Sequence, residues 1–136
     1  MSHLTTFKNN ALTNTKKDLL AVAVSEIAGL ELDFNHKNIK NTWINETVDA
    51  SFKYRGKHIA VGLRFETNAE GEEEAVVAGD FYGTGLNQEE LTNKIAQVYQ
   101  KHKVIETCLE ANWFINQDEI VQESNGDIVI EAYRYA

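Results

Sequence analysis

Proline is absent from the 136 residues, and Cys108 is the single cysteine. No proline-rich linker therefore divides the chain, and neither an internal repeat nor a low-complexity tract interrupts it, so we predict one domain over residues 1–136. A single cysteine excludes an intramolecular disulfide framework, which fits a reducing compartment.

Long hydrophobic runs are lacking as well. The longest, LLAVAV at residues 19–24, is far short of the ~20 residues that cross a bilayer. The opening residues MSHLTTFKNN do not follow the signal-peptide pattern, because no basic segment precedes an apolar run. We therefore expect a soluble, cytoplasmic protein without a membrane partner.

Basic residues are outnumbered, since 13 Lys and Arg stand against 21 Asp and Glu and give a net charge of −8. Nucleic acid is not an expected partner, because binding it requires Lys and Arg to neutralise phosphates. The densest acidic stretch, EGEEEAV, contains Glu72, Glu73 and Glu74. These residues form either a solvated face or an acidic surface for a basic partner.

Two segments have the periodicity of amphipathic helices. The first covers about residues 14–28, with Thr15 and Asp18 spaced as an N-terminal cap. The second covers about residues 88–111 and follows Asn87 and Glu90, which are spaced as a capping box. Its apolar stripe contains Leu91, Ile95, Val98, His102, Ile105 and Leu109.

The remaining segments predict strands and turns. We expect strands at residues 2–7 and 30–34, a meander whose turns fall at Arg55-Gly56 and in TNAEGE, and a final hairpin around Asn125-Gly126. NHKNIKNTWIN, at residues 35–45, is expected to be a loop pinned to the body by Trp43 and Ile44. The predicted fold is α+β: a single-layer, mostly antiparallel sheet of about five to seven strands with two amphipathic helices on one face. The other face, with polar residues such as Lys53 and Arg64, is expected to be solvated or to meet a partner.

A glycine-rich stretch, GDFYGTGLNQEEL at residues 79–91, precedes the second helix. It lacks the lysine of a phosphate-binding loop and the spacing of a dinucleotide fingerprint. Glu89 and Glu90 would repel an anion at the helix start. We therefore predict a strand-to-helix connection without a nucleotide or other cofactor. Asp80, Phe81 and Tyr82 lie at the start of this connection, and their side chains face either a partner or the core.

Residues that often carry catalysis form no recognisable set. The histidines are His3, His36, His58 and His102, and no pair of them has the local spacing of a zinc site. No serine lies in a nucleophile elbow. Asp80 ends a strand, where it acts as an acid or base or only forms the turn. The sequence thus predicts no metal site and leaves catalysis open, with a non-enzymatic protein favoured.

Several stretches together resemble one family. MSHLTTF, YRG, GDFYG, VYQKHKVIE and NGDIVIEAYRY are similar to the conserved hypothetical reading frame thirty-five family of chloroplasts and cyanobacteria, a domain of unknown function also found in bacteria and phages. The resemblance implies a small, non-secreted protein without an assigned activity. Related genes often lie near genes for AAA-type ATPases, which implies an accessory role. The positions it carries over are Met1 to His3, Tyr54 to Gly56, Asp80, Tyr99 and His102.

The hypothesis that follows is a non-enzymatic protein-binding or accessory module. Its partner is expected to be another protein, with an AAA-type ATPase as one candidate, and a homo-oligomer remains open. The candidate binding residues are His3, Tyr54, Arg55, Asp80, Phe81, Tyr82 and His102. One alternative is a phage or host inhibitor whose acidic surface, including Glu72 to Glu74, imitates nucleic acid. The other is a small enzyme or metal-binding protein that uses His3, His102 and Asp80.

Overall fold

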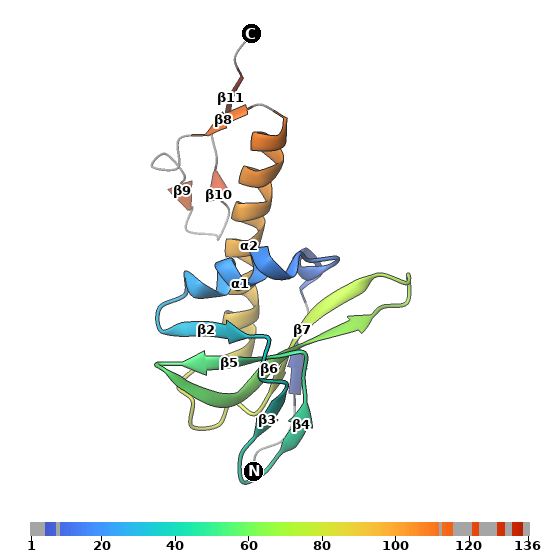
Figure 1. Ribbon diagram of the computed structural model, residues 1–136, viewed down its shortest axis with the longest axis vertical. Coiled ribbons are helices and arrows are strands. Elements are labelled where there is room, and N and C mark those ends of the chain that lie inside the picture. Colours follow the sequence, from blue (N-terminus) through green and yellow to red (C-terminus); the bar gives the residue numbers. More distant parts are fainter. Residues whose placement is uncertain are drawn as a thin grey trace.

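The structure is a computed structural model, and it describes residues 5–7, 9–111, 113–115, 121–122, 128–129 and 132–134, with side chains described between 9 and 111. Strands and helices are arranged as in Figure 1. The strands are β1 (Thr5–Phe7), β2 (Leu30–Asp33), β3 (Asn38–Lys40), β4 (Asn45–Thr47), β5 (Ala50–Tyr54), β6 (Lys57–Thr67), β7 (Glu73–Gly79), β8 (Trp113–Ile115), β9 (Val121–Gln122), β10 (Ile128–Val129) and β11 (Ala132–Arg134). The helices are the short 3-10 helix η1 (Asn10–Leu12), α1 (Lys17–Ser25) and α2 (Gln88–Glu110).

The main sheet has five strands in the order β1-β7-β6-β5-β2, and each neighbouring pair is antiparallel. Tight turns set this order. Arg55 and Gly56 have φ values of 53° and 81° between β5 and β6, and Gly71 has a φ of 78° between β6 and β7. Such positive φ values match the twist of a hairpin, and glycine adopts them without strain. Both predicted turns are therefore confirmed.

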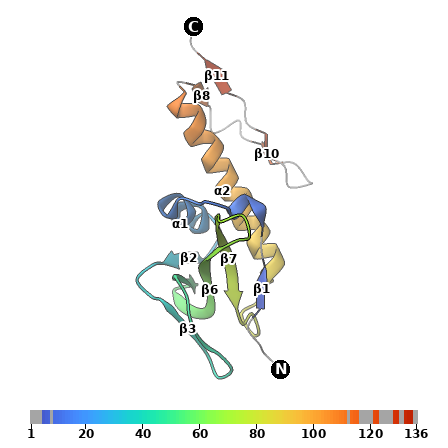
Figure 2. The ribbon, with the colours of Figure 1, turned by 90° about the vertical axis from the view of Figure 1, so that its right-hand side faces the viewer.

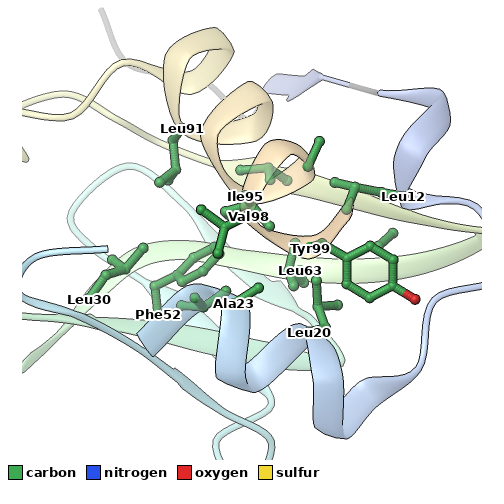
Figure 3. Packing of buried hydrophobic residues seen from close by; sticks show 14 of the residues in the cluster. Leu12, Leu20, Ala23, Leu30, Phe52, Leu63, Leu91, Ile95, Val98 and Tyr99 are labelled. Carbon is green, nitrogen blue, oxygen red and sulfur yellow. The ribbon is translucent and has the colours of Figure 1, made fainter. Parts of the chain in front are cut away.

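The hydrophobic core lies between one face of this sheet and the two helices (Figure 3). Phe52 and Leu63 from the sheet meet Leu20 of α1 and Ile95 of α2, and all four side chains are fully buried. Burial of apolar area is the main stabilising contribution, at about 25 cal/mol for each Å² removed from water. This is the predicted α+β fold, with both helices packed on a mostly antiparallel sheet.

Helix α1 is shorter than predicted. Its N-cap residue is Lys16, which makes no side-chain capping bond, so the predicted cap by Thr15 and Asp18 is wrong. Asn14 has a φ of 52°, and its backbone N–H donates to the carbonyl of Glu73 at 2.7 Å. This bond to the sheet holds the chain out of helical geometry at a position where the sequence pattern alone predicts a helix.

Residues 35–45 were predicted to be a loop, and this prediction is wrong. They contain β3 and the start of β4, which pair as a hairpin. β3 lies beside β6 and β5, and Ile39 in its middle is only 1% exposed. Gly62 of β6 lies close to the chain that follows the hairpin, because a Cβ there would stand 3.0 Å from Val48 Cγ2. The second face of the sheet is therefore partly covered by this hairpin instead of being wholly solvated.

Helix α2 matches its prediction closely. The side chain of Asn87 accepts a hydrogen bond from the N–H of Glu90 at 2.9 Å, as an N-cap does. The stripe is buried at Leu91, Ile95, Val98 and Ile105, whereas Leu109 near the end is 56% exposed. The helix continues past α1 and away from the sheet (Figures 1 and 2).

The end of the chain was predicted to form a hairpin. β8 pairs with β11 and β9 with β10, both antiparallel, and Val129 stands opposite Val121. This pairing confirms the two strands of the hairpin. The expected turn at Asn125-Gly126 lies outside the described residues.

Candidate functional site

Two loops from distant parts of the sequence are tied together at one end of the sheet. Nδ2 of Asn41, in the β3–β4 turn, donates a hydrogen bond of 2.9 Å to Oδ2 of Asp80, which follows β7. Asp80 is only 3% exposed, and its backbone N–H donates to the carbonyl of Ala60 at 2.8 Å. A hydrogen bond to a buried carboxyl group is strengthened by the low local dielectric. This contact fixes the position of one loop against the other.

The turn that carries Trp43 is closed by Asn41 as well. The amide Oδ1 of Asn41 accepts from the N–H groups of Trp43 at 2.8 Å and of Ile44 at 2.9 Å. The backbone N–H of Asn41 also donates to the carbonyl of Ile44 at 3.0 Å. Asparagine commonly closes a turn by bonding backbone groups two residues on. One side chain thus shapes this turn and links it to Asp80.

The loop between β7 and α2 is ordered by its own hydrogen bonds. Oδ1 of Asp80 accepts from the N–H of Tyr82 at 3.0 Å. Thr84 donates to the carbonyl of Phe81 through both its N–H at 3.1 Å and its hydroxyl at 2.7 Å. The hydroxyl of Thr84 then accepts from the N–H of Leu86 at 3.1 Å. These bonds make the glycine-rich stretch the strand-to-helix connection that the sequence predicts.

The side chains of residues 80–82, at the start of this connection, differ in their exposure to solvent. Asp80 is buried, and Phe81 is partly buried and packs on the hydrophobic core. Tyr82 is 79% exposed, and Trp43 on the neighbouring turn is 61% exposed. The sequence left open whether residues 80–82 face the core or a partner. In the fold the first two face inward and Tyr82 faces solvent.

Trp43 and Asn41 were missed as site residues by the sequence analysis. Trp43 was expected to pin its segment to the body, but Ile39 does so instead, and the indole is exposed. The available signal was the Asn-x-Trp order, in which an asparagine precedes a turn. That signal gives the local turn, but it does not reveal the bond to Asp80, which lies 39 residues further along the chain.

His102 does not join Asp80. It lies on α2, where its Nε2 is 3.0 Å from Oε2 of Glu26, and Nζ of Lys101 is 3.1 Å from the same oxygen. Gln88 at the start of α2 stays near β7, since its Nε2 donates to the carbonyl of Val77 at 3.1 Å. The helix rise of 1.5 Å per residue puts His102 about 21 Å along α2 from that end. A shared site of Asp80 and His102 therefore has no support, and His3 lies outside the described residues.

Glu26 joins the C-terminal end of α1 to the middle of α2. Partial burial acts to raise the pKa of this carboxyl group, but the hydrogen bond from Lys101 and the close approach of the His102 ring outweigh burial and hold the pKa below its usual range. The contacts account for His102 as a structural residue that fastens α1 to α2.

Tyr54 and Arg55, two further candidates, lie at the β5–β6 turn. The guanidinium carbon of Arg55 stands 5.1 Å from the centroid of the Tyr54 ring, and the N–H of Arg55 donates to the carbonyl of Gly29 at 2.7 Å. These contacts hold the β5–β6 turn against the end of the α1–β2 connection. They give both residues a structural role at a turn separate from Asn41 and Asp80.

The acidic candidates lie at the turn between β6 and β7. Oε2 of Glu72 accepts from Asn14 at 3.0 Å, and Oε1 of Glu74 accepts from Asn68 at 3.0 Å. Glu73 is exposed at the start of β7. Two of the three carboxylates thus hold the local chain in place, and the acidic partner surface stays a prediction.

A histidine pair that the sequence analysis did not connect is formed by one residue on β6 and one residue that follows β2. The rings of His36 and His58 stack with centroids 3.9 Å apart, and Nε2 of His58 is 3.0 Å from Oδ2 of Asp33. The bond from His58 holds the pKa of Asp33 below its usual range, with a smaller contribution from the backbone N–H of Asn35. Across the described part of the chain, no group of three or more His, Cys, Asp or Glu side chains is placed to hold a metal ion.

Comparisons with known proteins add no relative: no family model, curated protein or solved structure matches the chain. The resemblance to the reading frame thirty-five family stays a prediction. Within the described segments no helix has the length and apolar character required to cross a membrane. The exposed Trp43 and Tyr82, which lie on the two turns joined by the Asn41–Asp80 bond, are therefore the candidate site, and we call these four residues the aromatic surface.

Proposed function

We propose that this chain is a cytoplasmic protein-binding module, and that the aromatic surface is where its partner docks. The observation that carries the proposal is the exposure of Trp43 and Tyr82 on two turns joined by the part-buried Asn41–Asp80 hydrogen bond. Single exposed apolar side chains are ordinary on protein surfaces. Two large aromatic rings on rigid, linked turns are a different case, because Trp and Tyr dominate the residues that contribute most to protein interfaces.

Rigidity supports the proposal further. Binding is weakened by every side chain and loop that must be ordered at the interface. Here the amides of Trp43 and Tyr82 are both held by side-chain oxygens, at 2.8 Å and 3.0 Å. The backbones that present the rings are therefore already fixed before a partner arrives, so less of the binding energy is lost to ordering them.

The identity of the partner is open to three proposals carried by the sequence. An AAA-type ATPase is the class that the family resemblance implies, and a second copy of the chain would make a homo-oligomer. The third is a basic protein bound by Glu72 to Glu74 as a nucleic-acid imitator. The first two are compatible with docking at Trp43 and Tyr82, whereas the third requires a different surface.

The test is site-specific photo-crosslinking in cells of the source organism. A photoreactive residue is placed at position 43, at position 82, or at position 22 as a control, where Val22 is 47% exposed on α1 and belongs to no linked turn. We expect the same protein adduct from positions 43 and 82 and none of it from position 22. Absence of an adduct at both aromatic positions, or the same adduct from position 22, would overturn the proposal.

Alanine variants measure how much each aromatic side chain contributes to the binding free energy. Trp43→Ala and Tyr82→Ala should each weaken binding of the captured partner by about 2 kcal/mol, or roughly 30-fold. Since both side chains are largely exposed, their removal should change the free energy of unfolding by no more than about 0.5 kcal/mol. Thermal unfolding checks the second point, so that lost binding is not mistaken for lost folding.

A further inference from the structure

We infer that the partner of the aromatic surface presents arginine or lysine side chains, which the rings of Trp43 and Tyr82 and the neighbouring carboxylates receive together. This inference rests on the proposed function and adds the chemical class of the bound segment. It is argued from the charges of the two chain segments that form the surface.

The two segments that carry the rings contain acids and no bases. Residues 41–46 include Glu46, and residues 79–90 include Glu89 and Glu90 besides the buried Asp80, with no Lys, Arg or His in either segment. Glu89 and Glu90 are exposed, and Glu46 is half-buried. Because Gln88 donates to the carbonyl of Val77, the helix start with its two acids is held next to the end of β7. The surface therefore combines exposed aromatic faces with an excess of negative charge.

This combination suits a cation. The face of an aromatic ring attracts a guanidinium or ammonium group, and Trp is the most effective ring for this. Arginine also forms two parallel hydrogen bonds to a carboxylate. The same chain makes contacts between a cation and an aromatic ring internally. Nζ of Lys17 is 5.0 Å from the centroid of the Phe65 ring, and the guanidinium carbon of Arg55 is 5.1 Å from the centroid of the Tyr54 ring.

Neighbouring lysines reduce the local excess of negative charge at the aromatic surface. Lys40 ends β3 just before the first segment, and Lys94 lies in the second turn of α2. The net charge of −8 over the whole chain adds attraction at longer range, and such attraction raises association rates chiefly at low salt. Close contact at the rings then supplies selectivity that charge alone does not give.

The first arm of the test uses a defined probe. A short arginine-rich peptide of about ten residues is titrated into the ¹⁵N-labelled full chain at about 50 mM and about 300 mM salt. We expect chemical shift changes concentrated at residues 41–46 and 80–90, including the indole N–H of Trp43. Trp43→Ala keeps the net charge and should bind about five-fold more weakly, whereas the control Val22→Ala should bind as the natural chain does.

Two results of this arm would overturn the inference. One is a set of shift changes centred on the acidic turn at residues 70–74 instead of the aromatic surface. The other is equal affinity of Trp43→Ala and the natural chain, which would mean that acidity alone attracts the peptide.

The second arm separates this inference from the proposed function. Mass spectrometry of the adducts at positions 43 and 82 identifies the partner segment that lies against each of these two positions. A segment with Lys or Arg, whose synthetic copy loses affinity when those residues are changed to Gln, supports the inference. A captured segment without basic residues refutes the inference and leaves the docking surface intact, whereas the absence of any adduct removes both.

Discussion

Replacement of Asn41 by alanine tests the bond on which the aromatic surface depends. The change removes the donor to Asp80 at 2.9 Å and the acceptor for the N–H groups of Trp43 and Ile44. Depriving a buried acceptor of a hydrogen-bond donor costs about 1–3 kcal/mol, and each exposed turn bond contributes about 0.5 kcal/mol. The expected loss in the free energy of unfolding is therefore about 2–4 kcal/mol.

This loss is large enough to measure by two methods. For a chain of this size it corresponds to a fall in Tm of roughly 7–14 °C. Denaturation in guanidinium chloride should show a lower midpoint with an unchanged slope, because the surface exposed on unfolding stays the same. Capture of the partner by a photoreactive residue at position 43 should also fall, since the turn no longer holds that side chain in place.

A matched control lies in the same hairpin. Asn38 donates through Nδ2 to Oδ1 of Asn45 at 2.9 Å and to the carbonyl of Glu46 at 3.0 Å, and all of these groups are exposed. Asn38→Ala removes the same side-chain amide without touching Asp80, so it should cost less than about 1 kcal/mol. If both variants lose the same stability, the Asn41–Asp80 bond does not hold the two loops together and the reasoning is refuted.

Two further predictions concern the body of the fold. In Gly62→Ala the new Cβ would lie 2.5 Å from a backbone carbonyl oxygen of β5, so denaturant unfolding should show a loss of about 1–3 kcal/mol; a loss below about 0.5 kcal/mol would contradict this close approach. For Glu26, whose pKa is lowered by Lys101 and His102, the stabilisation is present above the ordinary glutamate value of 4.5 and is lost as the pH falls through the lowered pKa. Glu26→Gln should therefore flatten the fall in Tm on the acid side, and an unchanged acid limb would show that the carboxylate makes no such contribution.

Local rules account for the elements that were predicted correctly. The stripe of α2 recurs at helical spacing over many residues, and Asn87 caps it through a bond within one turn of chain. Arg55-Gly56 and Gly71 set turns through their own φ values. Each of these features depends on residues a few positions apart, so the pattern in the sequence contains the information that is needed.

Long-range contacts account for the elements that were predicted wrongly. α1 begins late because Asn14 bonds to Glu73, 59 residues away. β3 has three residues with only Ile39 buried, and one apolar residue between two polar ones is too short a pattern to indicate a strand. It becomes a strand because the second face of the main sheet offers Ile39 a place to be buried.

The candidate site also contains features that local sequence predicts and features that only long-range contacts decide. Asp80, Phe81 and Tyr82 were named from their position between a strand and a capped helix, and Glu89, Glu90 and the missing lysine led to the prediction of no phosphate there. The direction of each side chain was decided by the fold, which buries Asp80 against Ala60 and leaves Tyr82 in solvent. Trp43 entered the site only through the Asn41–Asp80 bond. Periodicity and turn chemistry are written into neighbouring residues, whereas a contact between two loops exists only after the sheet and the β3–β4 hairpin have brought them together.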